Sequence, residues 1–374
     1  MMDQPLVSII VNNYNYGRFL KEAINSAIDQ TYRHTEVIVV DDGSTDDSRE
    51  VMQEFGDKIV SVFQNNQGQA SAFNSGFEAS KGEIITFLDA DDILFPNAVE
   101  KMVALFMDPN VVTVHWPLCK VDVDGKMTGE IAPKQPLPEG LFKDQLIKYG
   151  PEHWGDSPLP CGHAYSRCFL ETVLPIPEKE FKAGADFYVF VLAPIFGILK
   201  RLAEPQAFYR IHGSNDTLKP LDEYIDRYQN WYDHAGVAIT KHLHAQGIEV
   251  DPNSWPQVSW YHQIKRSLEE INQHVPLNSS YILVDDDQWV SSDIIYGRHR
   301  IPFMEKDGRY WGKPENDDAA VTEIERLLKK GPTGIFFAWP AFWWLEYYSG
   351  MHHYLQSNYK CLVDNERLIG FDLR

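Results

Sequence analysis

Four short polar segments follow four apolar runs within the first hundred residues, and their residue types suit the binding of a cation and of phosphate. They are Asn12–Tyr16, Asp41–Ser44, Asn65–Gly68 and Asp89–Asp92. Asp89 and Asp91, one residue apart in an extended loop, can both reach one hard cation. Mg²⁺ or Mn²⁺ takes about six oxygen ligands and can bridge carboxylates to a diphosphate. The fourth segment is therefore a candidate metal site.

The first two segments carry groups that suit a nucleoside. The ring of Tyr14 can stack on a base, an interaction worth ~1–3 kcal/mol in nucleic-acid complexes. An Asp of the second segment, Asp41 or Asp42, can accept a hydrogen bond from the imide N–H of uracil or from a ribose hydroxyl. These groups predict a pocket that prefers uridine or thymidine nucleotides.

Each acidic segment also has an ordinary structural explanation. Asp41–Ser44 by itself is typical of a strand-to-helix turn with a helix cap. Asp89–Asp92 by itself is typical of an acidic loop that leads into a helix. Four polar segments at the ends of four apolar runs, however, are hard to explain by solubility, and together they favour one shared binding site.

The elements that must position these segments alternate along the chain. The apolar runs at 6–11, 36–40, 59–63 and 83–88 predict buried strands, and the stretches at 19–28, 44–55 and 70–79 predict helices. This alternation predicts a mostly parallel sheet with helices on both faces. Because ligands of such sheets bind at the carboxyl ends of the strands, the four polar segments should surround one crevice.

The rest of the chain predicts further elements and two later regions. We expect helices near 96 and at 187–196, and strands at 111–114, 119–123 and 207–211. Helical spacing dominates from 221 to 274, and strands at 281–284 and 334–339, a helix at 317–330 and a hairpin at 361–371 follow. The predicted domains are a catalytic domain at 1–218, a helical extension at 219–276 and a small α/β domain at 277–374.

Composition excludes several classes of protein. The 374 residues include 34 Lys and Arg against 54 Asp and Glu, a formal charge of −20, and no basic cluster is visible, so we expect no nucleic-acid partner. The four cysteines form no C-x-x-C pair, which argues against zinc and disulfides. No apolar run is long enough for a membrane span and no secretory signal is present, so we expect a soluble, cytoplasmic protein.

Five segments resemble, in order and spacing, the family-two glycosyltransferases with the A-type nucleotide-sugar fold. They are Pro5–Asn15, Val39–Asp46, Asn65-x-x-Gly68, Asn74-x-Gly76 and Gly82–Asp92, with looser matches at Ala185-Asp186 and Tyr209–Asn215. The resemblance covers about residues 5–216. It implies an α/β fold with a mostly parallel, Rossmann-like sheet. The sequence pattern beyond that region predicts a helical segment and a small C-terminal α/β domain.

The resemblance also implies roles for single residues. Asp41 and Asp42 would hold the nucleoside. Asp89 and Asp91 would hold the metal, Mn²⁺ or Mg²⁺, and the diphosphate. Asp186 would be the general base. The residues that complete the expected donor and metal site are Asn13, Tyr14, Gly68, Asn74, Arg210 and His212.

One departure from the family changes the expected phosphate contacts. Many relatives carry an Arg immediately before the residue that corresponds to Asn74, and this chain has Phe73 there. Phosphate binding would then depend more on the cation and on Arg210 or His212. His212 is either a metal ligand beside the diphosphate or a structural residue that follows a strand.

The implied reaction is displacement at the anomeric carbon with inversion. A base removes the proton of an acceptor hydroxyl, which attacks opposite the leaving diphosphate. Asp186 is the expected base, although an Asp near a helix start is often a cap. Asp156 and Glu180, in adjacent loops, are the substitutes. The donor would be a nucleotide-diphosphate sugar, and a UDP-sugar is favoured. The acceptor would be a saccharide, a lipid-linked molecule or a protein, in polysaccharide or similar assembly. Peripheral association with the inner face of the membrane is an alternative to a purely cytoplasmic location.

The C-terminal region gives weaker signals. Asp285–Asp287 invites a second metal site, but a solvated turn after a strand explains it more simply. His352 and His353 are adjacent rather than four apart, so we expect no metal there. The dense aromatic residues at 336–348 favour a packed core, and the alternative is an exposed platform that stacks sugars or seats a lipid-linked acceptor or a partner.

Two other functions fit parts of the pattern. A catalytically silent carbohydrate- or nucleotide-binding protein would keep the same fold, and a donor-hydrolysis assay would separate it from an enzyme. A nucleotidyltransferase that makes the activated sugar would also use a parallel sheet and carboxylate-bound Mg²⁺. That reaction usually requires a Gly-rich, basic phosphate loop, and the segment from Asn12 to Phe19 offers only Gly17 and Arg18.

Overall fold

The computed structural model describes residues 4–152, 160–213, 215, 221–289 and 293–374. Contacts divide the chain into two compact units, Met1–Asn215 with Asn230–Trp255, and Asp216–Gln229 with Pro256–Arg374. The long helix α8 (Leu221–Ala245) contributes its first part to the second unit and its remainder to the first.

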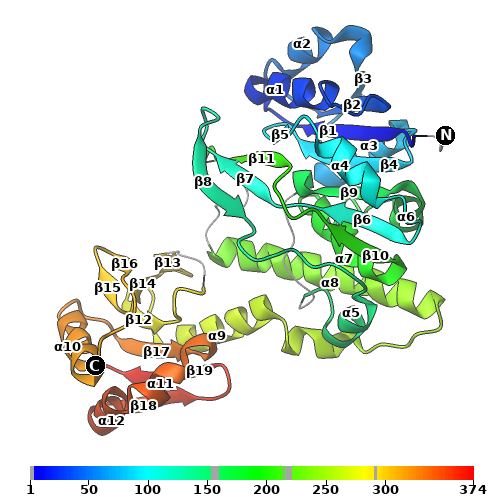
Figure 1. Ribbon diagram of the computed structural model, residues 1–374. Coiled ribbons are helices and arrows are strands. Elements are labelled where there is room, and N and C mark those ends of the chain that lie inside the picture. The colour runs from blue at the N-terminus through cyan, green and yellow to red at the C-terminus, as the bar shows by residue number, and fades with distance from the viewer. Residues whose placement is uncertain (1–3, 153–159, 214, 216–220, 290–292) are drawn as a thin grey trace. The chain divides into compact units, whose positions relative to one another are not determined.

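A seven-stranded sheet organises the first unit, in the order β10-β6-β9-β4-β1-β2-β3 (Figure 1). Its strands are β1 (Val7–Asn13), β2 (Thr35–Asp42), β3 (Val60–Gln64), β4 (Ile84–Asp89), β6 (Val111–His115), β9 (His163–Ser166) and β10 (Ile198–Arg201). All neighbours are parallel except β9, which runs antiparallel to both β4 and β6. The predicted fold class, α/β with a mostly parallel sheet, is confirmed.

Apolar side chains on both faces of β1 attach the helices to this sheet. Ile9 and Val11 pack with Leu20 and Ile24 of the amphipathic helix α1 in one core cluster. The helices and short 3₁₀ turns of the unit are α1 (Gly17–Ile28), α2 (Ser48–Gln53), η1 (Gly56–Lys58), α3 (Gln69–Ala79), α4 (Ala98–Leu105), α5 (Lys143–Tyr149), η2 (Pro160–Gly162), α6 (Arg167–Val173), α7 (Ala185–Phe196) and η4 (Pro252–Gln257), the last running into the second unit.

A second, smaller sheet of the first unit adjoins the acidic segment at the end of β4. Its order is β5-β11-β7-β8, with β5 (Ile93–Leu94), β7 (Leu118–Val121), β8 (Met127–Ala132) and β11 (Ala207–Arg210). β5 begins directly after Asp92 and pairs with β11, which ends at Arg210. This pairing brings the chain near residue 210 back to residues 89–92.

The second unit is built on a six-stranded sheet in the order β13-β14-β12-β17-β19-β18. The strands are β12 (Ser280–Val284), β13 (Ile294–Ile295), β14 (Arg298–Pro302), β17 (Gly334–Ala338), β18 (Lys360–Asp364) and β19 (Leu368–Asp372), with a separate hairpin β15 (Glu305–Lys306) and β16 (Arg309–Tyr310). The helical elements are α9 (Trp260–His274), α10 (Asp317–Leu328), η5 (Trp339–Ala341), α11 (Trp343–Tyr347) and α12 (Ser349–Asn358).

Two apolar clusters lie on the two faces of this second sheet. Ile335 and Phe337 of β17 pack with α10, α11 and α12, whereas Phe336 packs with α9, including Leu268. Most of the aromatic segment at 336–348 is therefore core, as the sequence predicts, but the side chain of Tyr347 is 71% exposed.

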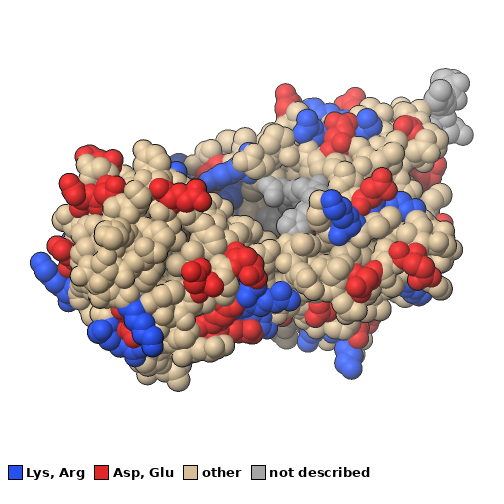
Figure 2. Space-filling model, turned by 90° about the horizontal axis from the view of Figure 1, so that it is seen from below, with Lys and Arg blue, Asp and Glu red and all other residues tan. Residues whose placement is uncertain are grey.

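The charged surface agrees with the composition. On the face shown in Figure 2, Lys and Arg side chains stand among Asp and Glu side chains rather than in a stripe. Among the described residues, no helix is both long and apolar enough to cross a membrane.

Close contact between α3 and β1 explains a glycine of the sequence motif at 74–76. A Cβ atom added to Gly76 would lie 2.4 Å from Cγ2 of Ile10 and 3.2 Å from Cγ2 of Val40. Both neighbours are β-branched and buried, so they can move little. A side chain at this position would push the helix away from the strand.

We expect Gly76→Ala to lower the free energy of unfolding by ~1–3 kcal/mol, because overpacking outweighs the better helix propensity of Ala. Urea unfolding of the full chain measures it. Gly236→Ala is the matched control, since a Cβ there would lie 3.6 Å from its nearest neighbour, in Trp255, and should stabilise α8 by up to ~1 kcal/mol. Equal effects of the two substitutions would contradict this account.

Candidate functional site

Three carboxylates crowd together where β4 ends. Asp89, Asp91 and Asp92 each offer an oxygen, and these oxygens all lie within 4.8 Å of one another. A turn closed by the Asp92 N–H donating to the Asp89 carbonyl, at 3.0 Å, bends the segment so that the side chains converge. Oxygen ligands at this spacing are what Mg²⁺ or Mn²⁺ prefers.

Burial and mutual repulsion make this cluster costly without a cation. Burial raises the pKa of Asp89 to about 7, and the charges of Asp91 and Asp186 add to the rise, while a hydrogen bond from Asn12 opposes it. Burial also raises the pKa of Asp92 well above its ordinary value. Its Oδ2 atom is buried and has no hydrogen-bond partner among the described residues. The chemistry of the site therefore fits a divalent cation.

His212 lies beside the cluster, as the sequence analysis requires of a metal ligand. Its Nε2 atom is 2.7 Å from Oδ2 of Asp91. The backbone N–H of His212 donates to Oδ1 of Asn215 at 2.8 Å, and its ring packs against Tyr16 and Phe19. The imidazole is thus held where it can either bind a cation with Asp91 or orient that carboxylate.

Arg210 is a brace for the acidic segment in this structure. Its Nε donates to the carbonyl of Asp91 at 3.0 Å, and its backbone N–H donates to Oδ1 of Asp92 at 3.0 Å. The two ends of the guanidinium donate to the carbonyl of Val123 and the carboxylate of Glu22. Its assignment to phosphate stays a prediction, since these contacts already use several of its donors.

Asp186 lies close enough to Asp89 for its charge to raise the pKa of that carboxyl. Gln69, at the start of α3, joins the two. Its Oε1 accepts the N–H groups of Gly184, at 3.0 Å, and of Ala185, at 3.1 Å, and its side chain also hydrogen-bonds Asp89. Gln69 therefore caps α7, whose N-cap residue is Gly184, so Asp186 inside the first turn is not needed as the cap.

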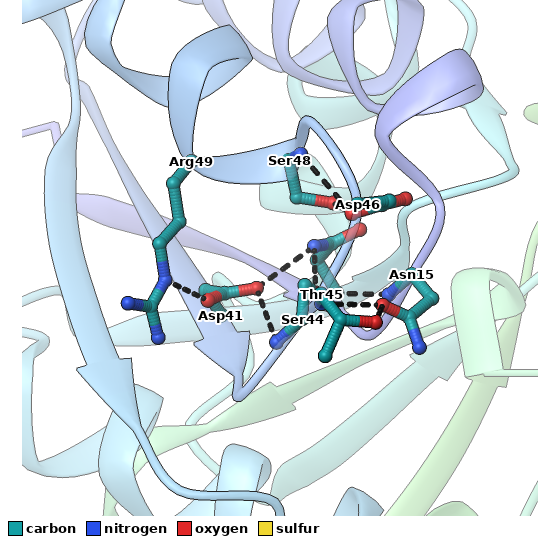
Figure 3. Close-up of polar contacts among 8 residues, drawn as sticks. Asn15, Asp41, Ser44, Thr45, Asp46, Ser48 and Arg49 are labelled. Atoms are coloured by element: carbon teal, nitrogen blue, oxygen red, sulfur yellow. Dashed lines mark hydrogen bonds and ion pairs between the residues drawn. The ribbon is translucent and has the colours of Figure 1, made fainter.

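The predicted nucleoside residues meet where β1 and β2 end side by side. The fully buried Asp41 accepts hydrogen bonds from Asn13 Nδ2 at 3.2 Å, from the Ser44 N–H at 3.3 Å and from Arg49 Nε at 3.0 Å (Figure 3). The ring of Tyr14 is 46% exposed, so a base could stack on it.

Asp42 accepts hydrogen bonds from the loop between β3 and α3. It accepts the backbone N–H groups of Gln67, at 2.9 Å, and Gly68, at 2.8 Å, together with Gln64 Nε2 at 2.7 Å. Gly68 has φ of +94° and a Cβ atom there would lie 2.4 Å from Lys182, so only glycine fits. Asp42 and Gly68 thus shape the entrance to α3.

Two motif residues of α3 face protein. Asn74 clamps the backbone of Ile176, donating from Nδ2 to its carbonyl at 3.0 Å and accepting its N–H at 2.8 Å. Phe73, where the family resemblance implies an Arg, is buried and stacks on Phe87 with ring centroids 3.9 Å apart. It fills the core.

The structure brings most of the predicted residues to two adjoining strand ends. Asn12 pairs with Asp89 and Asn13 with Asp41 in the registers of β1, so the predicted metal residues and the predicted nucleoside residues share one edge of the sheet.

Of the two alternatives to Asp186 as the base, Asp156 lies outside the described residues. The carbonyl of Glu180 accepts a hydrogen bond from Asn230.

Sequence reasoning missed three residues of this site, namely Asn12, Gln69 and Asp92. Asn12 Nδ2 donates to Oδ1 of Asp89 at 2.6 Å. Asn12 and Asp92 lie in the polar segments, so their position in the sequence could have identified them as site residues. No feature of the sequence around Gln69 indicates its role. Cys161 is a further buried neighbour, and burial together with the charge of Asp92 raises the pKa of its thiol well above its usual value.

Comparisons with known proteins identify similar chains. Residues 8–167 match the family model described as Glycosyl transferase family 2. An uncharacterized glycosyltransferase of Nostoc sp. is 39% identical over 238 residues, 63% of this chain and 73% of that protein. One of Rickettsia conorii is 39% identical over 196 residues, 51% of this chain and 32% of that protein. The crystal structure of S. aureus TarS 1-349 in complex with UDP shares the fold, with 16% identity, a TM-score of 0.52 and coverage of 97% and 95%.

We expect Asp91→Ala to weaken Mn²⁺ binding at least ~10-fold, because it removes a ligand and the partner of His212. Electron paramagnetic resonance of free Mn²⁺ in a titration of the full chain measures this. Asp57→Ala, which removes an exposed carboxylate of the same unit, is the matched control. Identical Mn²⁺ binding by both variants would remove the metal assignment.

Proposed function

The chain belongs to family 2 of the glycosyltransferases, and from this premise we propose that it transfers a sugar from a nucleotide-diphosphate sugar to an acceptor hydroxyl, with a divalent cation and with inversion. The observation that carries the proposal is the convergence of three carboxylates where β4 ends, with oxygens of Asp89, Asp91 and Asp92 within 4.8 Å of one another. A cation held there would bind the diphosphate of the donor, and Asp186, in the first turn of α7, would be the base.

The residues divide the chemistry between them. Asp89, Asp91 and Asp92 would hold the cation, with His212 beside them. Bound there, the cation would neutralise charge that develops on the leaving diphosphate. Asp186 takes the proton of the acceptor hydroxyl as its oxygen forms the new bond to the anomeric carbon. The bond from that carbon to the diphosphate breaks, and its electron pair leaves with the diphosphate.

The nucleoside half of the donor would lie over the ends of β1 and β2. The exposed ring of Tyr14 offers a stacking face, and Asp41 and Asp42 supply hydrogen-bond acceptors on a rigid frame. S. aureus TarS, which has a similar fold, was crystallised with UDP, so uridine donors are the first to test. We place the reaction in cell-surface polysaccharide or lipid-linked oligosaccharide assembly on the cytoplasmic side, with peripheral membrane association as an option.

A silent binding protein is the second candidate, and two observations favour it. Phe73 is buried where the family resemblance implies an Arg, and Arg210 is committed to protein acceptors. Both reduce the positive charge available to a diphosphate. Incubation with Mn²⁺ and UDP-, GDP- or dTDP-sugars separates the candidates, since only an enzyme releases nucleotide.

A nucleotidyltransferase fits the structure less well. The N–H of Gly17 donates to Asp46, and the guanidinium of Arg18 lies over the ring of Phe19 at 4.3 Å. A backbone N–H that is already bound to a carboxylate cannot receive a phosphate. The segment after β1 is therefore a poor phosphate loop.

Asp186→Asn should lower the rate of sugar transfer ~10²–10⁴-fold, because the amide cannot accept the proton, while nucleotide affinity stays within about twofold. Single-turnover transfer assays and nucleotide titration measure the two quantities. Glu180→Gln, the same change in a neighbouring loop, should leave both unchanged. Full activity of Asp186→Asn, or lost activity of Glu180→Gln alone, would assign the base elsewhere.

A further inference from the structure

The second unit has the strand arrangement at which open α/β sheets bind ligands. β12 lies between β14 and β17, and all three run parallel. After β12 the chain continues to β13 and β14, which lie on one side of β12 in the sheet. After β17 it continues to β18 and β19, which lie on the opposite side. Loops that leave neighbouring carboxyl ends in opposite directions define the ligand position of such sheets. In this unit that position lies at the ends of β12 and β17.

Side chains from the segments after all three parallel strands converge there on one carboxylate. Asp286 follows β12, and its Oδ2 accepts the indole N–H of Trp343, which follows β17, at 2.9 Å. Its Oδ1 accepts the indole N–H of Trp344 at 3.0 Å and the hydroxyl of Tyr310, in the hairpin after β14, at 3.1 Å. These bonds fix the orientation of the rings.

Part of this aromatic cluster faces solvent. Tyr347 is 71% exposed and its ring lies 6.0 Å from that of Trp343, which is half-buried. Trp311, which follows Tyr310 in the sequence, is 65% exposed. Nζ of Lys313 lies 4.4 Å from the centre of the Trp343 ring. Exposed rings held on a rigid base offer contact area at little entropic cost.

A buried donor in the same loop has no acceptor among the described residues. Trp289 is 2% exposed, and its indole N–H has no hydrogen-bond partner there. Its backbone N–H donates to Asp285, and its ring lies 5.6 Å from that of Trp339, the first residue after β17. Trp289 belongs to the apolar cluster on the face of the sheet opposite to Trp344, so it is not part of the aromatic cluster around Asp286.

A metal ion does not suit this place. Asp285 is paired with the buried Arg300, with 3.3 Å between Oδ2 and Nη1, and Asp286 is occupied by neutral donors. The one group of acidic, His or Cys side chains within ligand reach in the described parts of the chain is that at Asp89–Asp92. The sequence alternative of a second metal site at Asp285–Asp287 therefore lacks support.

We propose that this cluster, the rings of Trp343 and Tyr347 with the carboxylate of Asp287, is a binding site for a neutral oligosaccharide. The C–H face of a pyranose stacks on aromatic rings, and its hydroxyls donate to the exposed Asp287. The carboxylates of Asp286 and Asp287 repel phosphate groups and anionic lipid headgroups. The proposal does not depend on the transferase reaction.

Isothermal titration of the full chain with chitohexaose, maltohexaose and mannohexaose tests it. At least one of these should bind, and Tyr347→Ala should weaken that binding at least ~10-fold. Tyr347→Phe, which keeps the ring, should stay within about threefold of the unsubstituted chain. Both Tyr347 variants should release nucleotide from a sugar donor at the unsubstituted rate, because Tyr347 is not part of the first unit.

A second comparison separates this site from the acceptor position of the first unit. Asp91→Ala should leave hexasaccharide binding unchanged if the second unit binds it. The proposal is overturned if none of the three sugars binds at millimolar concentration, if Tyr347→Ala leaves the affinity unchanged, or if Asp91→Ala alone abolishes binding. Failure of donor hydrolysis would count against the proposed reaction but not against this site.

Discussion

Repulsion among three carboxylates at the end of β4 is the constraint on which the first unit depends. Two like charges 4 Å apart repel by about 4 kcal/mol at the effective dielectric constant typical of a protein surface. The folded chain tolerates the group because burial favours the protonated forms of Asp89 and Asp92, and because Asn12 and Arg210 donate to the segment. A sequence that needed only a stable turn would have no reason to assemble such a cluster.

The architecture around the cluster follows from this constraint. The pairing of β5 with β11 carries Arg210 and His212 to the acidic segment from more than a hundred residues away in the chain. Gln69 connects the end of β4 with the first turn of α7, so a shift of either element is felt at the other. Asp89 at the end of β4, Arg210 at the end of β11 and Asp186 in the first turn of α7 are therefore held by strands and a helix, which favours precise geometry.

The second unit neutralises a strand-end carboxylate in a different way. Asp286 is surrounded by neutral indole and phenol donors instead of by other acids. Neutral donors satisfy a carboxylate without attracting a cation, and they hold aromatic rings at the surface. The ends of parallel strands in the two sheets thus present two arrangements, three crowded carboxylates in the first unit and one carboxylate among neutral donors in the second.

The sequence by itself determined the parallel sheet of the first unit, because buried strands alternate with amphipathic helices, and it located the four polar segments, because those segments end the strands. It also predicted that most residues at 336–348 would be core, whereas the role of His212, which lies beside Asp91, stays a prediction. Only the tertiary structure decided which polar side chains face each other. Gln69 and Arg210 acquire their roles from contacts across 115 and 119 residues, and Phe73 from stacking on Phe87. Local sequence carries no record of such pairs, since they depend on how sheets and helices pack.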